Sequence, residues 1–303
     1  MKTKLEAICS NVLVNEPMAK HTSFKIGGPC DYMVLPTTLD EVKAVLAFAK
    51  EEGIRVTVLG NGSNVLVADD GIDGIVLKTT QLKSITCCGN EITASAGARL
   101  SALCEVAKEH SLGGLAELSG IPGTVGGGVY MNAGAYGGEI KDTLVSSLYL
   151  DEAGELKKLT AEEHELSYRY SVFHKHPDWI VLETTFSLTP SNRDELHEKT
   201  VDLLKKRNEK QPLEYPNAGS TFKRPEGYFA GKLIEDAGLR GFSAGDAQVS
   251  EKHCGFVINR GNASAEDVKT LIESVRKIVA EKFGVTLEAE VRYIKRNEPE
   301  ATL

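Results

Sequence analysis

A stretch of twenty-two residues, from Ser119 to Ile140, constrains the fold of this chain most, because eight of the residues are glycine. Each glycine costs a helix about 1 kcal/mol relative to alanine, so a run this dense is not typical of an ordinary helix. Glycine has no Cβ atom and lets a backbone approach a ligand closely. We interpret the stretch as a loop that wraps a flat, phosphorylated ligand. A glycine-rich surface loop explains the glycines alone equally well.

A second glycine loop lies upstream and reads Gly60-Asn61-Gly62-Ser63-Asn64. The apolar runs on either side of it, 56–59 and 65–67, are typical of β-strands. Successive backbone N–H groups in such a loop can bind an anion, although a segment of this kind is more often a plain turn. Neither loop has the glycine spacing of a dinucleotide-binding βαβ unit, and no P-loop lysine follows.

Composition and charge exclude several classes of protein. A chain of 303 residues with 41% hydrophobic residues can bury a large core. The net charge of −8 argues against nucleic acid or an anionic membrane as a partner. No apolar run approaches the length of a membrane span, and Glu6 interrupts the first segment, so we expect no secretion signal. The six cysteines lack CxxC spacing, which predicts reduced cytosolic thiols and no metal site.

The order of patterns predicts an α+β protein with three parts, residues 1–80, 81–190 and 191–303. In the first part, a capping box at Thr38 opens a helix that stops near Gly53. The second part holds a hairpin over 144–159 and a strand at 179–188. The third part begins with a helix that ends near residue 209. A second capping box, at Ser264, opens a helix up to Gly284, and 285–294 is predicted as the last strand.

The two loops taken together closely resemble one family, the UDP-N-acetylenolpyruvoylglucosamine reductases. The resemblance rests on VLGNGSNVLV followed by LSGIPGTVGGGVYMNAGAYGGEI, and on the later motifs SYRYS, PNAGSTFKRP and LEAEVRYI. It implies a two-part FAD-binding domain similar to the vanillyl-alcohol-oxidase type, with FAD in the cleft between the parts, and a C-terminal α+β substrate-binding domain. It also implies that bound FAD, reduced by NADPH, passes hydride to an enolpyruvyl ether of a UDP-sugar in cell-wall precursor synthesis.

Three residues in these motifs match the positions that do chemistry in the family. Arg169, in SYRYS, is expected to bind the substrate carboxylate, since a guanidinium forms two parallel hydrogen bonds with such a group. If its segment is extended, the tyrosines lie on one face and Arg169 lies with the serines on the other. Ser220 is expected to donate a proton to the α-carbon. Glu290, rather than Glu288, is expected to act with Arg169. Read without the family, these residues are a surface arginine, a turn serine and a solvated glutamate.

The resemblance also assigns residues to the ligands. Those expected at FAD lie in the two glycine loops: Gly60, Asn61, Gly62, Ser63, Asn64, Ser119, Gly120, Ile121, Pro122, Gly123, Thr124, Gly126, Gly127, Asn132, Gly134 and Ala135. Four basic residues are expected at the substrate, although each is equally typical of a solvated surface charge: Lys210, Lys223, Lys252 and His253. Neither loop holds a histidine or cysteine for a covalent flavin link, so we expect non-covalent FAD. The short spacing from Arg169 to Ser220 matches the subtype without an extra tyrosine loop.

We therefore expect a cytoplasmic, monomeric reductase that uses FAD and NADPH and has no nucleic-acid or membrane partner. Two other functions stay open. An oxidase could use the same FAD domain on a sugar or alcohol, and a non-catalytic protein could bind flavin without reacting with NADPH.

Overall fold

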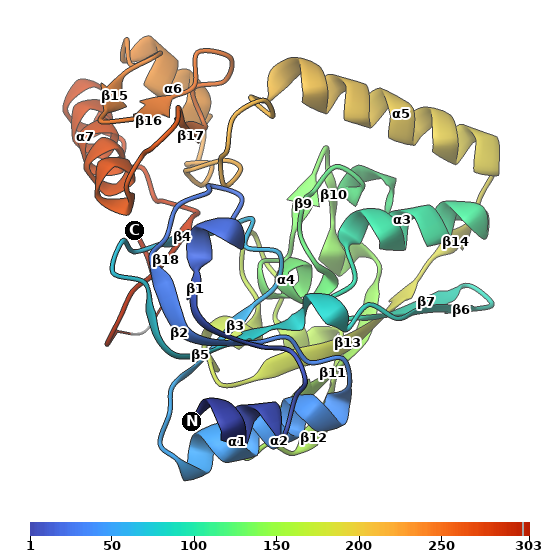
Figure 1. Ribbon diagram of the computed structural model, residues 1–303. Coiled ribbons are helices and arrows are strands. Elements are labelled where there is room, and N and C mark those ends of the chain that lie inside the picture. The colour runs from blue at the N-terminus through green and yellow to red at the C-terminus, as the bar shows by residue number, and fades with distance from the viewer. Residues whose placement is uncertain (299) are drawn as a thin grey trace. The chain divides into compact units, whose positions relative to one another are not determined.

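The computed structural model describes residues 1–298 and 300–303, and these divide into two compact units. Unit 1 comprises residues 1–13, 33–61 and 75–207, and unit 2 comprises 14–32, 62–74 and 208–303. Each unit has its own buried hydrophobic cluster, one running from Ile92 to Leu188 and the other from Phe24 to Val291. The structure confirms that helices and strands are mixed throughout (Figure 1).

Unit 1 is built around a five-stranded antiparallel sheet in the order β12-β11-β13-β7-β6. Its strands are β6 (Ile85–Cys88), β7 (Glu91–Ser95), β11 (Leu144–Leu150), β12 (Leu156–Thr160) and β13 (Ile180–Ser187). Two short pairs accompany it, namely β8 (Leu112–Gly113) with β14 (Thr189–Pro190), and β9 (Gly134–Ala135) with β10 (Gly138–Glu139). The hairpin predicted at 144–159 is confirmed, because Asp151 accepts hydrogen bonds from the backbone N–H groups of Ala153 and Glu155.

Unit 1 contains five of the α-helices in the described residues. They are α1 (Lys2–Glu6), α2 (Leu39–Glu51), α3 (Leu100–Glu109), α4 (Val125–Tyr130) and α5 (Arg193–Lys210), which Figure 1 shows as one long helix whose last three residues fall in unit 2. Thr38 caps α2 by accepting a hydrogen bond from the Glu41 backbone, as predicted. Val42, Val45 and Ala49 of α2 are buried, as their spacing requires.

One four-stranded sheet, in the order β1-β2-β5-β3, draws residues from both units. Its strands are β1 (Val12–Pro17), β2 (Pro29–Val34), β5 (Ile72–Lys78) and β3 (Val56–Leu59). The last two are parallel, with Val56 opposite Ile75. The strand predicted at 56–59 therefore ends where the first glycine loop begins.

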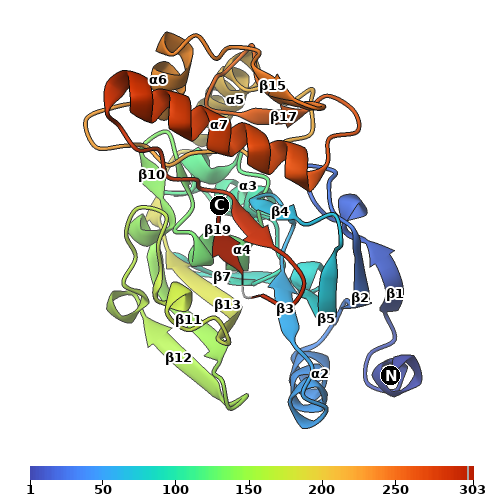
Figure 2. The same ribbon diagram turned by 90° about the vertical axis from the view of Figure 1, so that its left-hand side faces the viewer.

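Unit 2 contains two three-stranded sheets and two helices. The sheets are β15-β16-β17, formed by Ser243–Ala244, Ala247–Val249 and Val257–Asn259, and β19-β18-β4, formed by Ala301–Thr302, Arg292–Ile294 and Val65–Val67. The helices are α6 (Ala230–Asp236) and α7 (Ala265–Phe283). Helix α7 packs against β15 and β16, and Figure 2 shows it in front of this sheet.

The ends of α7 match the sequence prediction, but the last predicted strand does not. Ser264 and Asp267 form the capping box, and Gly284 ends the helix with φ 67°. The strand predicted over 285–294 is wrong in length, since the strand covers Arg292–Ile294 and the segment before it makes one isolated bridge, at Ala289. Its alternation is nevertheless present, because Leu287, Ala289 and Val291 are buried and Glu288 is exposed.

Candidate active site

The first two residues of the first glycine loop lie against the second loop within unit 1. The Asn61 side-chain amide donates a hydrogen bond of 2.6 Å to the carbonyl of Pro122. A Cβ atom on Gly60 would overlap the hydroxyl of Thr124. The contact joins segments that are 61 residues apart in the chain. The two loops that the sequence singled out are therefore structural neighbours.

The backbone of the first glycine loop offers several hydrogen-bond donors. Within the described residues, no hydrogen bond is donated by the backbone N–H groups of residues 61–64. Gly62 has φ 64°, and its Cα packs on the carbonyl of His21, so no side chain fits there. Consecutive unpaired N–H groups on a tight glycine turn form an anion-binding nest. The loop therefore fits the phosphate groups of a dinucleotide such as FAD.

The second glycine loop is not a loop throughout. The prediction of non-helical structure is wrong for Val125–Tyr130, which form α4, with Thr124 as the N-cap. The glycines allow this helix to pack closely, because a Cβ on Gly126 would lie 2.9 Å from Ala96 Cβ and one on Gly128 would lie 3.3 Å from Leu100. A Cβ on Gly127 would meet only the Thr124 hydroxyl, at 3.5 Å. Gly127 is thus the glycine of α4 whose open face can meet a ligand.

Arg207 is a residue of this site that the sequence reasoning missed. A Cβ on Gly120 would lie 2.8 Å from Arg207 Cδ, so the missing side chain of Gly120 makes room for the arginine stem. Arg207 is half-buried, and this burial lowers the pKa of its guanidinium. Arg207 stood in an ordinary amphipathic helix pattern, so no local signal distinguished it.

Arg169 lies on a tight turn, so the extended arrangement considered from the sequence does not occur. Ser167 and Tyr170 exchange two backbone hydrogen bonds of 3.2 and 3.1 Å, which close residues 167–170 into a turn. We call these four residues the arginine turn. Arg169 has φ 54°, a conformation that favours glycine. Its Nη2 donates a hydrogen bond of 3.2 Å to the carbonyl of Gly134.

Ser220 and Glu290 are brought together within unit 2. Thr221 accepts a hydrogen bond of 2.8 Å from the Glu290 N–H, and Phe222 pairs with Ala289 in an antiparallel bridge. Ser220 is exposed, and its hydroxyl makes no hydrogen bond within residues 1–298 and 300–303. A hydroxyl that no other described group engages is suited to donating a proton to a bound molecule.

The backbone of Glu290 is tied to the first glycine loop. Asn64, the last residue of that loop, donates a hydrogen bond of 3.2 Å from its side chain to the Glu290 carbonyl. Arg292, two residues on, forms an ion pair of 2.7 Å with Glu300. Its charge is thereby partly neutralised by a carboxylate other than that of Glu290.

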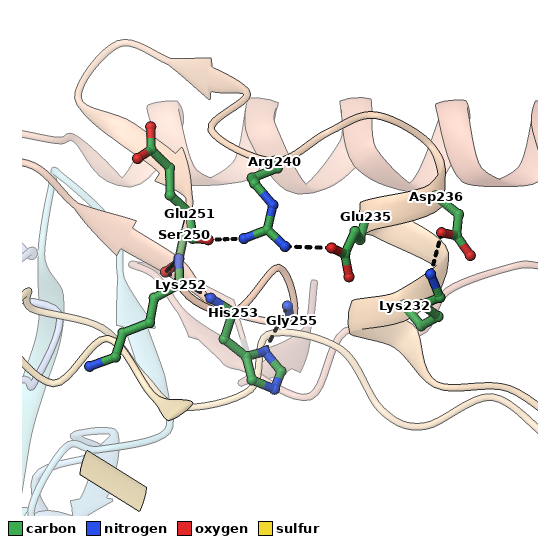
Figure 3. Close-up of polar contacts among 9 residues, drawn as sticks. All are labelled: Lys232, Glu235, Asp236, Arg240, Ser250, Glu251, Lys252, His253 and Gly255. Atoms are coloured by element: carbon green, nitrogen blue, oxygen red, sulfur yellow. Dashed lines mark hydrogen bonds and ion pairs between the residues drawn. The ribbon is translucent and has the colours of Figure 1, made fainter. Parts of the chain in front are cut away.

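The four residues expected at the substrate differ in their surroundings. Lys223 and Lys252 lie near the carboxylates of Glu288 and Glu214, at 3.3 and 3.5 Å. Lys210 is exposed at the end of α5. Figure 3 shows the His253 ring turned toward Gly255, whose N–H donates a hydrogen bond of 3.0 Å to Nδ1, while Lys252 extends away.

Burial lowers the pKa of His253. This imidazole therefore offers a hydrogen bond rather than a positive charge at neutral pH. No group of three or more His, Cys, Asp or Glu suited to a metal ion occurs in the described part of the chain. No helix among the residues described is long and apolar enough to cross a membrane.

Comparison with known proteins identifies two matching families. Residues 30–160 match the FAD binding domain, and residues 211–294 match the C-terminal domain of UDP-N-acetylenolpyruvoylglucosamine reductase. The FAD family covers both ends of the contact between the glycine loops, and the second family covers Ser220 and Glu290. The expected fold class, an FAD-binding domain followed by a C-terminal α+β domain, is confirmed.

Similar proteins cover nearly the whole chain. The UDP-N-acetylenolpyruvoylglucosamine reductase of Lachnoclostridium phytofermentans is 53% identical over 288 residues, which is 93% of each chain. That of Caldanaerobacter subterraneus is 50% identical over 281 residues, again 93% of each chain. The crystal structure of the Thermus caldophilus reductase superposes with a TM-score of 0.80 at 32% identity, covering 94% of this chain and 98% of its own. This chain therefore belongs to the UDP-N-acetylenolpyruvoylglucosamine reductase family.

Proposed function

We propose that this protein reduces the enolpyruvyl ether of UDP-N-acetylglucosamine to UDP-N-acetylmuramate, with FAD as its cofactor and NADPH as its reductant. Membership of the reductase family and the match to an FAD binding domain support the enzyme class and both cofactors. The observation that carries the assignment of residues is the backbone pairing of Thr221 with Glu290, since Ser220 is the residue next to this pairing.

The two glycine loops are the proposed FAD site. The unpaired N–H groups of residues 61–64 are suited to phosphate oxygens, and the open face of Gly127 is suited to close contact. Arg207, across Gly120, is proposed to bind a phosphate of FAD with its guanidinium. The loops hold no histidine or cysteine, which supports non-covalent binding. When bound, FAD supplies the hydride for the β-carbon of the enolpyruvyl group.

The residues of this chain then stabilise charge and move one proton. We assign Arg169 and Glu290 to the substrate carboxylate, on which negative charge accumulates as hydride is added to the double bond. Hydrogen bonds aimed at that charge lower the barrier in the manner of an oxyanion hole. We assign the Ser220 hydroxyl as the proton donor to the α-carbon. Addition of one hydride and one proton saturates the double bond, so electrons and atoms balance.

Binding of the diphosphate or uridine of the substrate is proposed for Lys210, Lys223, Lys252 and His253. In this proposal Lys223 and Lys252, which lie near Glu288 and Glu214, exchange a carboxylate for a phosphate when substrate binds. The division at residues 80 and 190, a monomeric state and a cytoplasmic location stay predictions.

The absorption spectrum of the purified protein tests this function. We expect a flavin band that NADPH bleaches and that the enolpyruvyl UDP-sugar restores much faster than oxygen does. An oxidase would react faster with oxygen, and a non-catalytic flavin protein would not bleach with NADPH. Either of these results would contradict the proposal.

A further inference from the structure

The conformation of the arginine turn needs support from outside the turn. Arg169 has φ 54°, in the left-handed region where a side chain with a Cβ is strained. A residue held in such a conformation keeps it only when the surrounding structure imposes it. The two backbone hydrogen bonds between Ser167 and Tyr170 close the turn but do not attach it to the rest of unit 1. Other groups must therefore fix its place.

Asn132 attaches the first residue of the turn. Its side chain is fully buried, and its Nδ2 donates hydrogen bonds to the Ser167 carbonyl at 2.9 Å and to Glu139 Oε2 at 3.1 Å. Its Oδ1 accepts a hydrogen bond of 3.0 Å from the Lys141 N–H. The Ser167 carbonyl also accepts the N–H of Tyr170, so Asn132 bonds the same atom that closes the turn. Both side-chain N–H groups of Asn132 are thus used inside the protein.

Ser171 attaches the residue that follows the turn. It is fully buried, and its hydroxyl donates a hydrogen bond of 2.7 Å to the carbonyl of Tyr130, the last residue of α4. The His174 ring, one helical turn further on, stacks on the rings of Tyr130 and Tyr170, with centroids 4.2 and 5.2 Å apart. The arginine turn is therefore fastened at both ends to the segment that begins where α4 ends.

We infer that Asn132 and Ser171 are positioning residues that aim the guanidinium of Arg169 at the substrate carboxylate. This inference rests on the role proposed for Arg169. It also changes the part assigned to Asn132, since a side-chain donor to FAD would have to break one of its internal bonds. A misplacement of about 1 Å in a positioned group can cost roughly 100-fold in rate. Loss of either anchor is therefore expected to slow the step that uses Arg169.

Two buried serines of unit 1 provide a matched test. Ser171 and Ser147 are exposed to 0% and 1%, and the Ser147 hydroxyl bonds to Thr184 and His164, away from the arginine turn. Ser171→Ala and Ser147→Ala are expected to lower the melting temperature similarly. Only Ser171→Ala should slow reoxidation of the reduced flavin by substrate, by about 10- to 100-fold. Reduction by NADPH should proceed normally in both.

A second variant and a second measurement separate the positioning role from a general loss of folding stability. Asn132 has φ 41°, so Asn132→Gly keeps a compatible backbone while it removes the buried side chain and its hydrogen bonds. In hydrogen-exchange mass spectrometry of the full-length protein, Asn132→Gly and Ser171→Ala should speed exchange in the peptide over 165–172. Ser147→Ala should leave that peptide unchanged. Combining Ser171→Ala with Arg169→Lys should slow reoxidation no further than Arg169→Lys alone.

The results separate this inference from the function on which it rests. If Arg169→Lys reoxidises at the wild-type rate, the proposed role of Arg169 is wrong, and positioning by Asn132 and Ser171 fails with it. If Arg169→Lys is slow but Ser171→Ala and Asn132→Gly behave like Ser147→Ala in both measurements, the positioning role alone is overturned. Slow reoxidation with faster exchange in both anchor variants supports it.

Discussion

A single methyl group added to α4 distinguishes a glycine that serves a ligand from one that serves the fold. Gly126 and Gly127 are neighbours in this helix, but only Gly126 is closed off by the protein. An alanine Cβ at 126 would lie 2.9 Å from Ala96 Cβ and 3.2 Å from its carbonyl oxygen. The same atom at 127 would meet only the Thr124 hydroxyl, at an ordinary 3.5 Å.

The two substitutions should therefore change stability in opposite directions. Replacing a helical glycine by alanine contributes about 0.5–1 kcal/mol, and nothing offsets this gain at position 127. At position 126 the helix must move away from β7, which strains the 2.8 Å hydrogen bond from Gly126 N–H to the Ala96 carbonyl. Overpacking of this kind costs about 1–3 kcal/mol. We expect apo Gly127→Ala to melt slightly higher than the wild type and apo Gly126→Ala to melt lower.

FAD binding should nevertheless fall in Gly127→Ala. If the open face of Gly127 contacts the cofactor, the added methyl group overpacks that contact. Overpacking of this kind should weaken the binding free energy by about 1–3 kcal/mol. At 1.4 kcal/mol for each factor of ten, this corresponds to roughly 5- to 150-fold weaker binding. A stable protein with a weakened cofactor is a combination that a folding defect cannot produce.

Titration of apoprotein with FAD, followed by flavin fluorescence, measures the dissociation constant, and thermal melting of the same apoprotein measures stability. Gly53→Ala is not a suitable control, because Gly53 has φ 64°. Wild-type FAD affinity in Gly127→Ala would refute the reasoning, since it would show that this face of α4 does not meet the cofactor.

Four further outcomes are expected. Arg169→Lys should lower the rate of reoxidation by substrate at least tenfold, because lysine keeps the charge but cannot form the paired hydrogen bonds of a guanidinium; wild-type turnover would make Arg169 peripheral. Ser220→Ala should reduce its flavin with NADPH at the normal rate but be reoxidised by substrate about 10²–10⁴-fold more slowly in stopped flow, and equal slowing of both halves would contradict its role. Arg207→Met should weaken FAD binding about 10- to 150-fold, because a hydrogen bond to a charged group contributes about 1.5–3 kcal/mol. An unchanged FAD titration would exclude this contact. Burial lowers the pKa of His164, so the unfolded state binds the proton more tightly than the folded state does. The melting temperature should therefore fall as pH drops below about 6.5. His164→Gln should flatten this pH dependence, and an unaltered slope would assign the dependence to other groups.

The sequence by itself determined the features that depend on neighbours in the chain. Thr38 and Ser264 marked the first turns of α2 and α7, because a capping side chain bonds a backbone N–H three residues away. The alternation of 287–291 gave the buried and exposed faces correctly. The two glycine loops, read together, identified the family, and the FAD-domain and reductase family models confirm that resemblance.

Only the tertiary structure decided what each functional residue contacts. The sequence showed eight glycines between 119 and 140 but not that Gly120 makes room for Arg207, or that Gly126 makes room for Ala96. It could not place Ser220 beside Glu290, because that arrangement depends on pairing between segments about seventy residues apart.

The arginine turn shows the physical reason most directly. Local preference favours an extended conformation for Ser167-Tyr168-Arg169-Tyr170, with its aromatic residues. The segment instead forms a turn. In this turn the Asn132 side chain donates a hydrogen bond to the Ser167 carbonyl, and the Ser171 hydroxyl donates one to the Tyr130 carbonyl. Packing against a distant part of the chain thus overrides a local preference of a few tenths of a kcal/mol per residue, and a sequence pattern contains only the local preference.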